Sequence, residues 1–121
     1  ILYLHGGAFF VGSPTAYAPL CGRIARLAAT EVIAPEYPLL PHAVFPAAPA
    51  AAPAAWEAVR SLGHAPGDIV IGGDSAGGNL VFGLLAQVLA RQERPAGAFA
   101  FSPWTDLTLS GESLRTLGPR D

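Results

Sequence analysis

The chain has 121 residues, of which 51% are hydrophobic and only 13% are charged, and its formal net charge is −2. Its basic residues are scattered arginines that form no basic run, which argues against a nucleic-acid partner. No uninterrupted apolar stretch is long enough to span a bilayer, and the single cysteine, Cys21, has no partner for an internal disulfide.

The first third of the chain predicts two short strands around a helix. Residues 1–4 are expected as a buried strand and residues 31–34 as another, because both are short apolar runs. Between them, a helical pattern runs over residues 18–29. Its apolar side chains share one face: Leu20, Ile24 and Leu27. Cys21 falls in this helix, where we expect it to be a small core residue.

In the middle of the chain, the prolines predict a loop and the spacing of apolar residues predicts a helix after it. Residues 35–46 are rich in proline and are expected as a loop. The helix that follows is marked by three apolar residues: Trp56, Val59 and Leu62. We expect this helix to end before Gly63, with Pro53 in its first turn, where a missing N–H costs nothing.

The last third completes an alternation of strands and helices. A strand is expected over residues 68–72, a helix over residues 76–91 and a strand over residues 98–101. Elements that alternate at this spacing form a parallel sheet with helices on both faces, the α/β class. The active loops of such sheets lie at the carboxyl ends of the strands.

A serine turn, Gly-Asp-Ser-Ala-Gly-Gly at residues 73–78, separates a buried strand from a buried helix. Such a turn exposes the Ser75 hydroxyl above a helix N-terminus, in a strained backbone for which we predict a positive φ. Gly73 and Gly77 supply the necessary room because they lack a Cβ. A structural turn serine is the alternative, but the flanking strand and helix favour the nucleophile elbow of a serine hydrolase.

A second loop, His-Gly-Gly-Ala-Phe at residues 5–9, follows the first strand. In acyl transfer the carbonyl oxygen becomes an oxyanion, which needs N–H donors already aimed at it. A glycine loop lets the backbone approach closely, and the N–H of Ala76 would complete the hole. An ordinary Gly-rich turn is the alternative, but two halves of one oxyanion hole at successive strand ends argue against it. We therefore expect Ser75 to lie near this loop.

Together, the two motifs resemble those of the hormone-sensitive-lipase-like esterases of the α/β-hydrolase superfamily. Residues 37–41, 45–48 and 102–108 are also similar to segments of that family, so the resemblance covers the whole chain. It implies the α/β-hydrolase fold, Ser75 as the nucleophile, and hydrolysis of carboxylic esters with short or medium acyl chains. The implied oxyanion donors are three N–H groups: Gly7, Ala8 and Ala76. The residues expected to support the site flank these groups: His5, Gly6, Gly73, Asp74 and Gly77.

Four positions depart from the family pattern. Pro38 stands where the family usually has arginine, and His42 where it usually has glutamate, so any ion pair between those positions is lost. Ala16 and Tyr17 stand where the family's opening motif often ends in serine or threonine followed by histidine. We expect these changes to alter loop packing more than chemistry.

The chain does not contain a complete catalytic triad in the order of this superfamily, which is serine, acid, histidine. Its three histidines all precede Ser75: His5, His42 and His64. His5 borders the site, and we expect it to brace the oxyanion loop through hydrogen bonds, with a role as the general base as the alternative. His64 is expected in a solvated turn.

The acid is likewise not identified within the chain. Asp74 lies beside Ser75 but is expected to point away from where a base would stand. Asp106 is expected to brace a loop, with a role as the acid as the alternative, and Asp121 at the chain end is a poor candidate. We therefore expect residues 1–121 to be the central part of a single α/β-hydrolase catalytic domain. Its N-terminal cap, acid and histidine would lie outside the chain.

The expected function is hydrolysis of a small-molecule ester through a serine acyl-enzyme in the full-length parent. Two alternatives stay open: a hormone- or ligand-binding receptor of the same fold, and an amidase or peptidase. A histidine further along the parent would indicate an enzyme rather than a receptor. The sequence has no metal-binding cluster and no nucleotide-phosphate loop, so no cofactor or metal is expected. The oligomeric state is not indicated.

Overall fold

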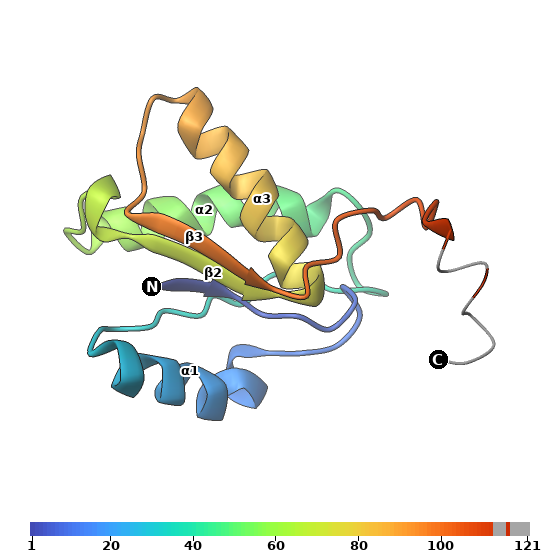
Figure 1. Ribbon diagram of the computed structural model, residues 1–121, viewed down its shortest axis with the longest axis horizontal. Helices are drawn as coiled ribbons and strands as arrows, with labels where there is room; N and C mark the ends of the chain where they lie inside the picture. The colour runs from blue at the N-terminus through green and yellow to red at the C-terminus, as the bar shows by residue number, and fades with distance from the viewer. Residues whose placement is uncertain (113–115, 117–121) are drawn as a thin grey trace.

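Three parallel strands form one sheet in the part of the chain that the structure describes. The structure is a computed structural model that describes residues 1–112 and residue 116. The strands follow one another across the sheet in chain order: β1 (Leu2–Leu4), β2 (Val70–Asp74) and β3 (Gly97–Phe101). The parallel sheet predicted from the sequence is confirmed (Figure 1).

The carboxyl ends of the strands meet at one edge of the sheet. Leu4 pairs with Gly73, and Asp74 pairs with Phe101. The loop that follows β1 and the turn that follows β2 therefore begin side by side, as expected for the functional edge of a parallel sheet.

Helices cover both faces of the sheet. Helix α1 (Pro14–Ala28) lies on one face, whereas α2 (Ala47–Ser61) and α3 (Ser75–Ala90) lie on the other (Figure 1). Helix α3 packs against all three strands, and α2 packs against β1 and α3. A short 3₁₀ helix, η1 (Pro66–Asp68), precedes β2, which is why β2 begins two residues later than predicted. The predicted α/β arrangement is confirmed.

The hydrophobic core lies between the sheet and the α2–α3 pair. Its side chains come from the strands and from both helices: Leu2, Leu4, Trp56, Ile71, Val81 and Leu84. Burying one side chain of this size stabilises the fold by about 1.5–3 kcal/mol. Trp56 also donates its Nε1–H to Glu93 at 2.7 Å, and Glu93 pairs with Arg60 at 3.2 Å. These bonds tie α2 to the turn after α3.

Helix α1 begins about one turn earlier than predicted, and its expected apolar face is largely exposed. The Ser13 side chain caps its N-terminus by accepting a first-turn N–H at 3.1 Å. Leu20 is 39% exposed and Leu27 75% exposed. The reason is that the helix turns Tyr17 and Cys21, which lie one turn apart, toward the sheet instead. Cys21 is buried, as predicted.

The strand predicted over residues 31–34 is reduced to a single bridge between Ile33 and β1. Ile33 donates its N–H to the Ile1 oxygen at 2.8 Å and accepts the N–H of Tyr3 at 2.9 Å. The next bond of a parallel ladder would need an N–H at position 35, which is proline and has none. The pairing therefore ends after one residue.

Helix α2 begins earlier than predicted, so Pro53 lies in its interior rather than in its first turn. Because Pro53 has no N–H, the carbonyl of Pro49 has no intrahelical donor. Trp56 and Val59 are buried as the helical pattern predicts, whereas Leu62 follows the helix and is 66% exposed.

Candidate active site

Ser75 is the first residue of α3 and directly follows the last residue of β2. Its φ is +50°, so the positive φ predicted from the sequence is confirmed. A non-glycine residue in this region stores on the order of 1–3 kcal/mol of strain. The side chain is half-buried. The serine therefore stands at a strained strand-to-helix junction, on the carboxyl edge of the sheet.

Two glycines bring this serine turn into contact with the end of β1. A Cβ on Gly77 would overlap the carbonyl oxygens of Leu4 and His5. A Cβ on Gly73 would lie 2.5 Å from the Leu4 oxygen. Only residues without a side chain fit at these two positions. The two sequence motifs, which are far apart in the chain, therefore meet in the fold.

The loop after β1 has three consecutive residues with positive φ. The angles are +119° at Gly7, +54° at Ala8 and +60° at Phe9. The Gly7 carbonyl accepts the N–H groups of Phe10 and Val11 at 2.9 Å each, which closes the loop. Within residues 1–112, no acceptor is assigned to the N–H of Gly7 or of Ala8. Both N–H groups are therefore free to bind an anion.

Ala76 offers a third N–H at the same edge. It is fully buried and is the second residue of α3. An N–H in the first turn of a helix has no intrahelical acceptor, and the helix dipole adds a partial positive charge there. The N-terminus of α3 is therefore suited to stabilising negative charge next to Ser75.

The Asp74 carboxylate joins the serine turn to the loop after β1. Its Oδ1 accepts the N–H of Gly6 at 2.9 Å and the hydroxyl of Tyr3 at 3.0 Å. Its Oδ2 accepts the hydroxyl of Tyr17 at 2.9 Å. Both carboxylate oxygens are therefore occupied by hydrogen bonds from β1, from the loop that follows it and from α1.

Burial and the neighbouring Asp74 carboxylate both raise the pKa values of the two tyrosines. Burial, followed by the negative charge of Asp74, raises the pKa of Tyr3 far above its usual range. Burial and the hydrogen bond to Asp74 raise the pKa of Tyr17. Both phenols therefore stay protonated at neutral pH and remain hydrogen-bond donors.

His5 is completely buried beneath the loop. Because a carbonyl oxygen can only accept, the Nδ1 atom carries a proton and donates it to the Gly6 oxygen at 2.8 Å. The Tyr37 ring stacks on the imidazole with centroids 4.3 Å apart, and its hydroxyl donates to the His5 carbonyl at 2.5 Å. The Nε2 atom is buried and has no partner among the described residues. The imidazole is therefore held in a fixed position beneath the loop.

The other titratable candidates lie elsewhere. His42 is exposed, and His64 lies 3.6 Å from Glu31 at the amino ends of the strands, opposite Ser75. Hydrogen bonds from the side chains and N–H groups of Ser110 and Thr108 hold the pKa of Asp106 well below its usual range. Asp106 therefore braces its own loop, as predicted. The remaining candidate, Asp121, lies outside the described residues.

Three tyrosines that complete the site were not assigned roles from the sequence: Tyr3, Tyr17 and Tyr37. Tyr17 and Tyr37 were visible only as parts of loop motifs, and Tyr3 as one member of an apolar strand. For Tyr3 the sequence did contain a signal. It is the one residue with a polar hydroxyl in a strand otherwise made of leucine and isoleucine, and a buried tyrosine hydroxyl usually has a hydrogen-bond partner.

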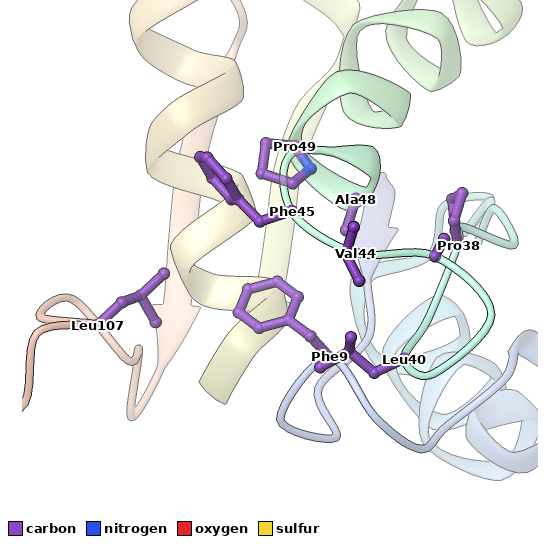
Figure 2. Close-up of a pocket in the computed structure, with 9 residues that line it drawn as sticks. Phe9, Pro38, Leu40, Val44, Phe45, Ala48, Pro49 and Leu107 are labelled. Atoms are coloured by element: carbon purple, nitrogen blue, oxygen red, sulfur yellow. The ribbon is translucent and has the colours of Figure 1, made fainter.

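An apolar pocket of about 90 Å³ opens beside the loop (Figure 2). Its lining residues come from four segments: Phe9, Pro38, Leu40, Ala43, Val44, Phe45, Ala48, Pro49 and Leu107. Leu40 donates its N–H to the Phe9 oxygen at 2.8 Å. On the other side, the Phe9 ring lies 6.4 Å from the ring of Trp104. The backbone N–H of Trp104 donates to the backbone carbonyl oxygen of Ser75 at 2.9 Å. Phe9 thus connects the pocket to the serine turn.

Neither a metal cluster nor a membrane-crossing helix is found in the described part of the chain. No three side chains of histidine, cysteine, aspartate or glutamate gather there in a way that could hold a metal ion. None of the helices over residues 1–112 is both long and apolar enough to cross a bilayer.

Comparison with known proteins gives consistent matches. The sequence pattern of the α/β-hydrolase fold family matches residues 1–119. The chain is 40% identical over 116 residues to an esterase of Acinetobacter venetianus, and 36% identical over 124 residues to an ethyl acetate hydrolase of Pseudomonas putida. It superposes with a TM-score of 0.90 and 38% identity on the crystal structure of an esterase from the bacterial hormone-sensitive lipase family.

The matches differ in how much of each protein they cover. They include 95% and 98% of this chain for the two relatives, and 100% for the crystal structure. By contrast, the chain spans only 38% and 39% of the relatives' own lengths, and 41% of the crystallised chain.

Proposed function

Because the chain belongs to the α/β-hydrolase fold family, among its hormone-sensitive-lipase-like esterases, we propose that the full-length protein hydrolyses carboxylic esters through Ser75. The observation that carries this proposal is the meeting of two features at one edge of the sheet. One is a serine held at a φ of +50° on the N-terminus of α3. The other is a loop in which the N–H groups of Gly7 and Ala8 have no assigned acceptor among the described residues.

The proposed reaction has two steps of the same kind. The Ser75 oxygen attacks the ester carbonyl carbon while its proton passes to a base, and the carbonyl oxygen becomes an oxyanion. The N–H groups of Gly7, Ala8 and Ala76 stabilise this oxyanion, each contributing about 3–4 kcal/mol. The base then protonates the leaving alcohol, which gives an acyl-enzyme. Water repeats the sequence, releases the carboxylic acid and regenerates Ser75.

We further propose that residues 1–121 are the central part of one catalytic domain. No histidine follows Ser75 in the chain, whereas this superfamily places its histidine after the serine. The chain spans about two fifths of the relatives that it matches. A base histidine, its acid partner and a cap are therefore assigned to other segments of the full-length protein.

The direct test of the proposed function is hydrolysis of p-nitrophenyl butyrate by the purified full-length protein. We expect turnover with an initial burst of nitrophenol when deacylation is the slower step. A folded protein that neither releases nitrophenol nor reacts with a serine-directed phosphonate would contradict the proposal.

His5 is proposed to brace the loop and not to act as the base. The His5→Ala variant should lose activity, but by less than the about 10²–10³-fold that loss of one oxyanion donor costs. The burst of product should remain, because the nucleophile and its base are intact. Pre-steady-state kinetics of the full-length variant measure this. A loss as large as that of Ser75→Ala, with no burst, would instead identify His5 as the base.

The apolar pocket beside Phe9 is proposed to receive the hydrocarbon chain of the ester (Figure 2). The pocket is small, with a volume of about 90 Å³, so a short hydrocarbon chain suits it better than a long one. Its walls are side chains of alanine, valine, leucine, proline and phenylalanine, so a short alkyl group would be bound without an unpaired polar atom.

Narrowing this pocket should change chain-length preference. Val44 lines the pocket and is 69% exposed, so Val44→Trp can be introduced without disturbing the core. We expect the ratio of kcat/KM for butyrate over acetate esters to fall by about tenfold or more, the range in which a pocket discriminates single methylene groups. Values of kcat/KM are measured for two series of esters, one with longer acyl groups and one with longer alcohols. The series whose preference changes shows which end of the ester occupies the pocket. An unchanged preference in both series would overturn the assignment.

A further inference from the structure

We propose that Asp74 and Tyr17 act together as a clamp that positions the oxyanion loop, with Tyr17 as its outer half. The clamp is defined as the Asp74 carboxylate and the Tyr17 hydroxyl that it accepts. The inference rests on the proposed function of the site, because it concerns how the oxyanion donors are held. Neither residue touches the substrate, so both are positioning residues.

The two ends of the oxyanion loop are tied to the same carboxylate. The loop leaves β1 at His5 and reaches α1 at Pro14. Near its start, Gly6 N–H donates to Oδ1 of Asp74 at 2.9 Å. Beyond its end, in the first turn of α1, the Tyr17 hydroxyl donates to Oδ2 at 2.9 Å. Asp74 is the last residue of β2 and is bonded directly to Ser75. The nucleophile and both loop ends therefore share one anchor.

The near end of the loop is pressed directly against this anchor. A Cβ on Gly6 would overlap the Asp74 carboxylate and would lie 3.0 Å from the Asp74 carbonyl oxygen. The adjoining Gly7 and Ala8 carry the proposed oxyanion donors, so a shift of Gly6 would move both N–H groups. Misplacement of catalytic groups by about 1 Å can cost about 10²-fold in rate.

The position of the far end of the loop depends on how α1 packs against the sheet, and Tyr17 makes many of the contacts between them. Cys21 is the one buried residue of α1. The apolar residues Leu20 and Leu27 are exposed. The Tyr17 ring lies 6.3 Å from that of Tyr3 and 5.3 Å from that of His5, and its hydroxyl bonds to Asp74. Without the hydroxyl, α1 loses its hydrogen bond to the serine turn.

The clamp predicts a specific loss in Tyr17→Phe. In the full-length protein, kcat for p-nitrophenyl butyrate should fall by about 10- to 100-fold, less than complete loss of an oxyanion donor. KM should stay within about twofold, because ground-state binding of the ester does not use the oxyanion donors. The inhibition constant of butylboronic acid, which forms a tetrahedral anionic adduct on serine, should rise by the same factor as kcat falls.

Two comparison variants separate the clamp from general destabilisation. Asp74→Asn should lower kcat at least as much as Tyr17→Phe, since it weakens both halves of the clamp. Thr15→Val removes an exposed hydroxyl from the same turn of α1 and should leave kcat and boronate affinity unchanged. The Tm of all variants is measured alongside. A Tyr17→Phe protein with unchanged kcat, or with a boronate affinity that follows KM rather than kcat, would overturn the clamp.

A readout independent of activity keeps this inference distinct from the proposed function. Amide hydrogen exchange over residues 6–12 should be faster in Tyr17→Phe than in the parent, while exchange in α3 is unchanged. If the parent hydrolyses esters but loop exchange is the same in both proteins, the clamp is wrong and the function stands. If the parent has no esterase activity while loop exchange increases, the clamp stands and the function is wrong.

Discussion

Replacement of Ser75 by alanine in the full-length protein should lower kcat for p-nitrophenyl butyrate by about 10⁶-fold, the size of loss seen when a serine hydrolase loses its nucleophile. Alanine keeps the turn small, so the backbone at this position is not crowded further. What is lost is the oxygen that forms the acyl-enzyme, and the oxyanion donors alone cannot replace it. Steady-state and burst kinetics of the purified variant measure the effect.

The matched control for Ser75→Ala is Ser61→Ala. Ser61 ends α2, and its hydroxyl donates to the Ala58 oxygen within the same helix. Its removal should leave kcat and KM unchanged. Residual turnover above about 1% of the parent in Ser75→Ala would contradict Ser75 as the nucleophile, because residual catalysis by oxyanion stabilisation alone is far smaller than that.

Replacement of Gly77 by alanine should strongly destabilise the fold. The new Cβ would overlap the carbonyl oxygens of Leu4 and His5, which belong to backbone and cannot swing away. Relief requires α3 to move away from β1, and overpacking of this kind costs about 1–3 kcal/mol and occasionally more. Because α3 carries Ser75 and Ala76, the same movement should also separate the nucleophile from the oxyanion loop and lower kcat.

Gly83 provides the control within the same helix. It lies in α3, and apart from its chain neighbours and the adjoining helix backbone, no described atom lies within 4 Å of where its Cβ would be. Gly83→Ala should therefore raise the free energy of unfolding by about 0.5–1 kcal/mol through helix propensity. Urea unfolding of both full-length variants measures the contrast. Equal stabilities for Gly77→Ala and Gly83→Ala would show that α3 does not contact the end of β1 as closely as the structure indicates.

Sequence patterns predict well those parts of the fold that are determined by neighbouring residues in the chain. Ser75 lies between glycines, after an apolar strand and before an apolar helix, and its positive φ follows from that local context. Helix α3 and strand β3 lie within one residue of their predicted bounds. The parallel order of the strands follows from their alternation with helices.

The parts that sequence patterns miss depend on partners elsewhere in the chain. The spacing of Leu20 and Leu27 indicates an apolar helix face but not whether anything covers it, and both side chains are exposed. The run at residues 31–34 has strand composition, yet the proline at position 35 stops its pairing. Tyr17 departs from the family motif, and the motif alone does not reveal its partner. That partner is Asp74, far along the chain, which accepts a hydrogen bond from the Tyr17 hydroxyl.

Some of the strained backbone lies where the proposed chemistry occurs. Ala8, Phe9 and Ser75 all have positive φ without being glycine, and all three lie at the carboxyl edge of the sheet. Each such residue stores on the order of 1–3 kcal/mol, which persists only where the surrounding structure holds it. The buried His5 and the Asp74 carboxylate supply that hold through their bonds to Gly6.

The central claim is that Ser75 forms an acyl-enzyme, and mass spectrometry of peptides from the trapped enzyme tests it most directly. The full-length protein is mixed with p-nitrophenyl butyrate, quenched in acid within the burst phase, and digested. We predict a butyryl adduct on the peptide that contains Ser75, and no adduct in Ser75→Ala. A butyryl group carried by any other residue, or rapid hydrolysis by Ser75→Ala with no adduct in the parent, would contradict the claim.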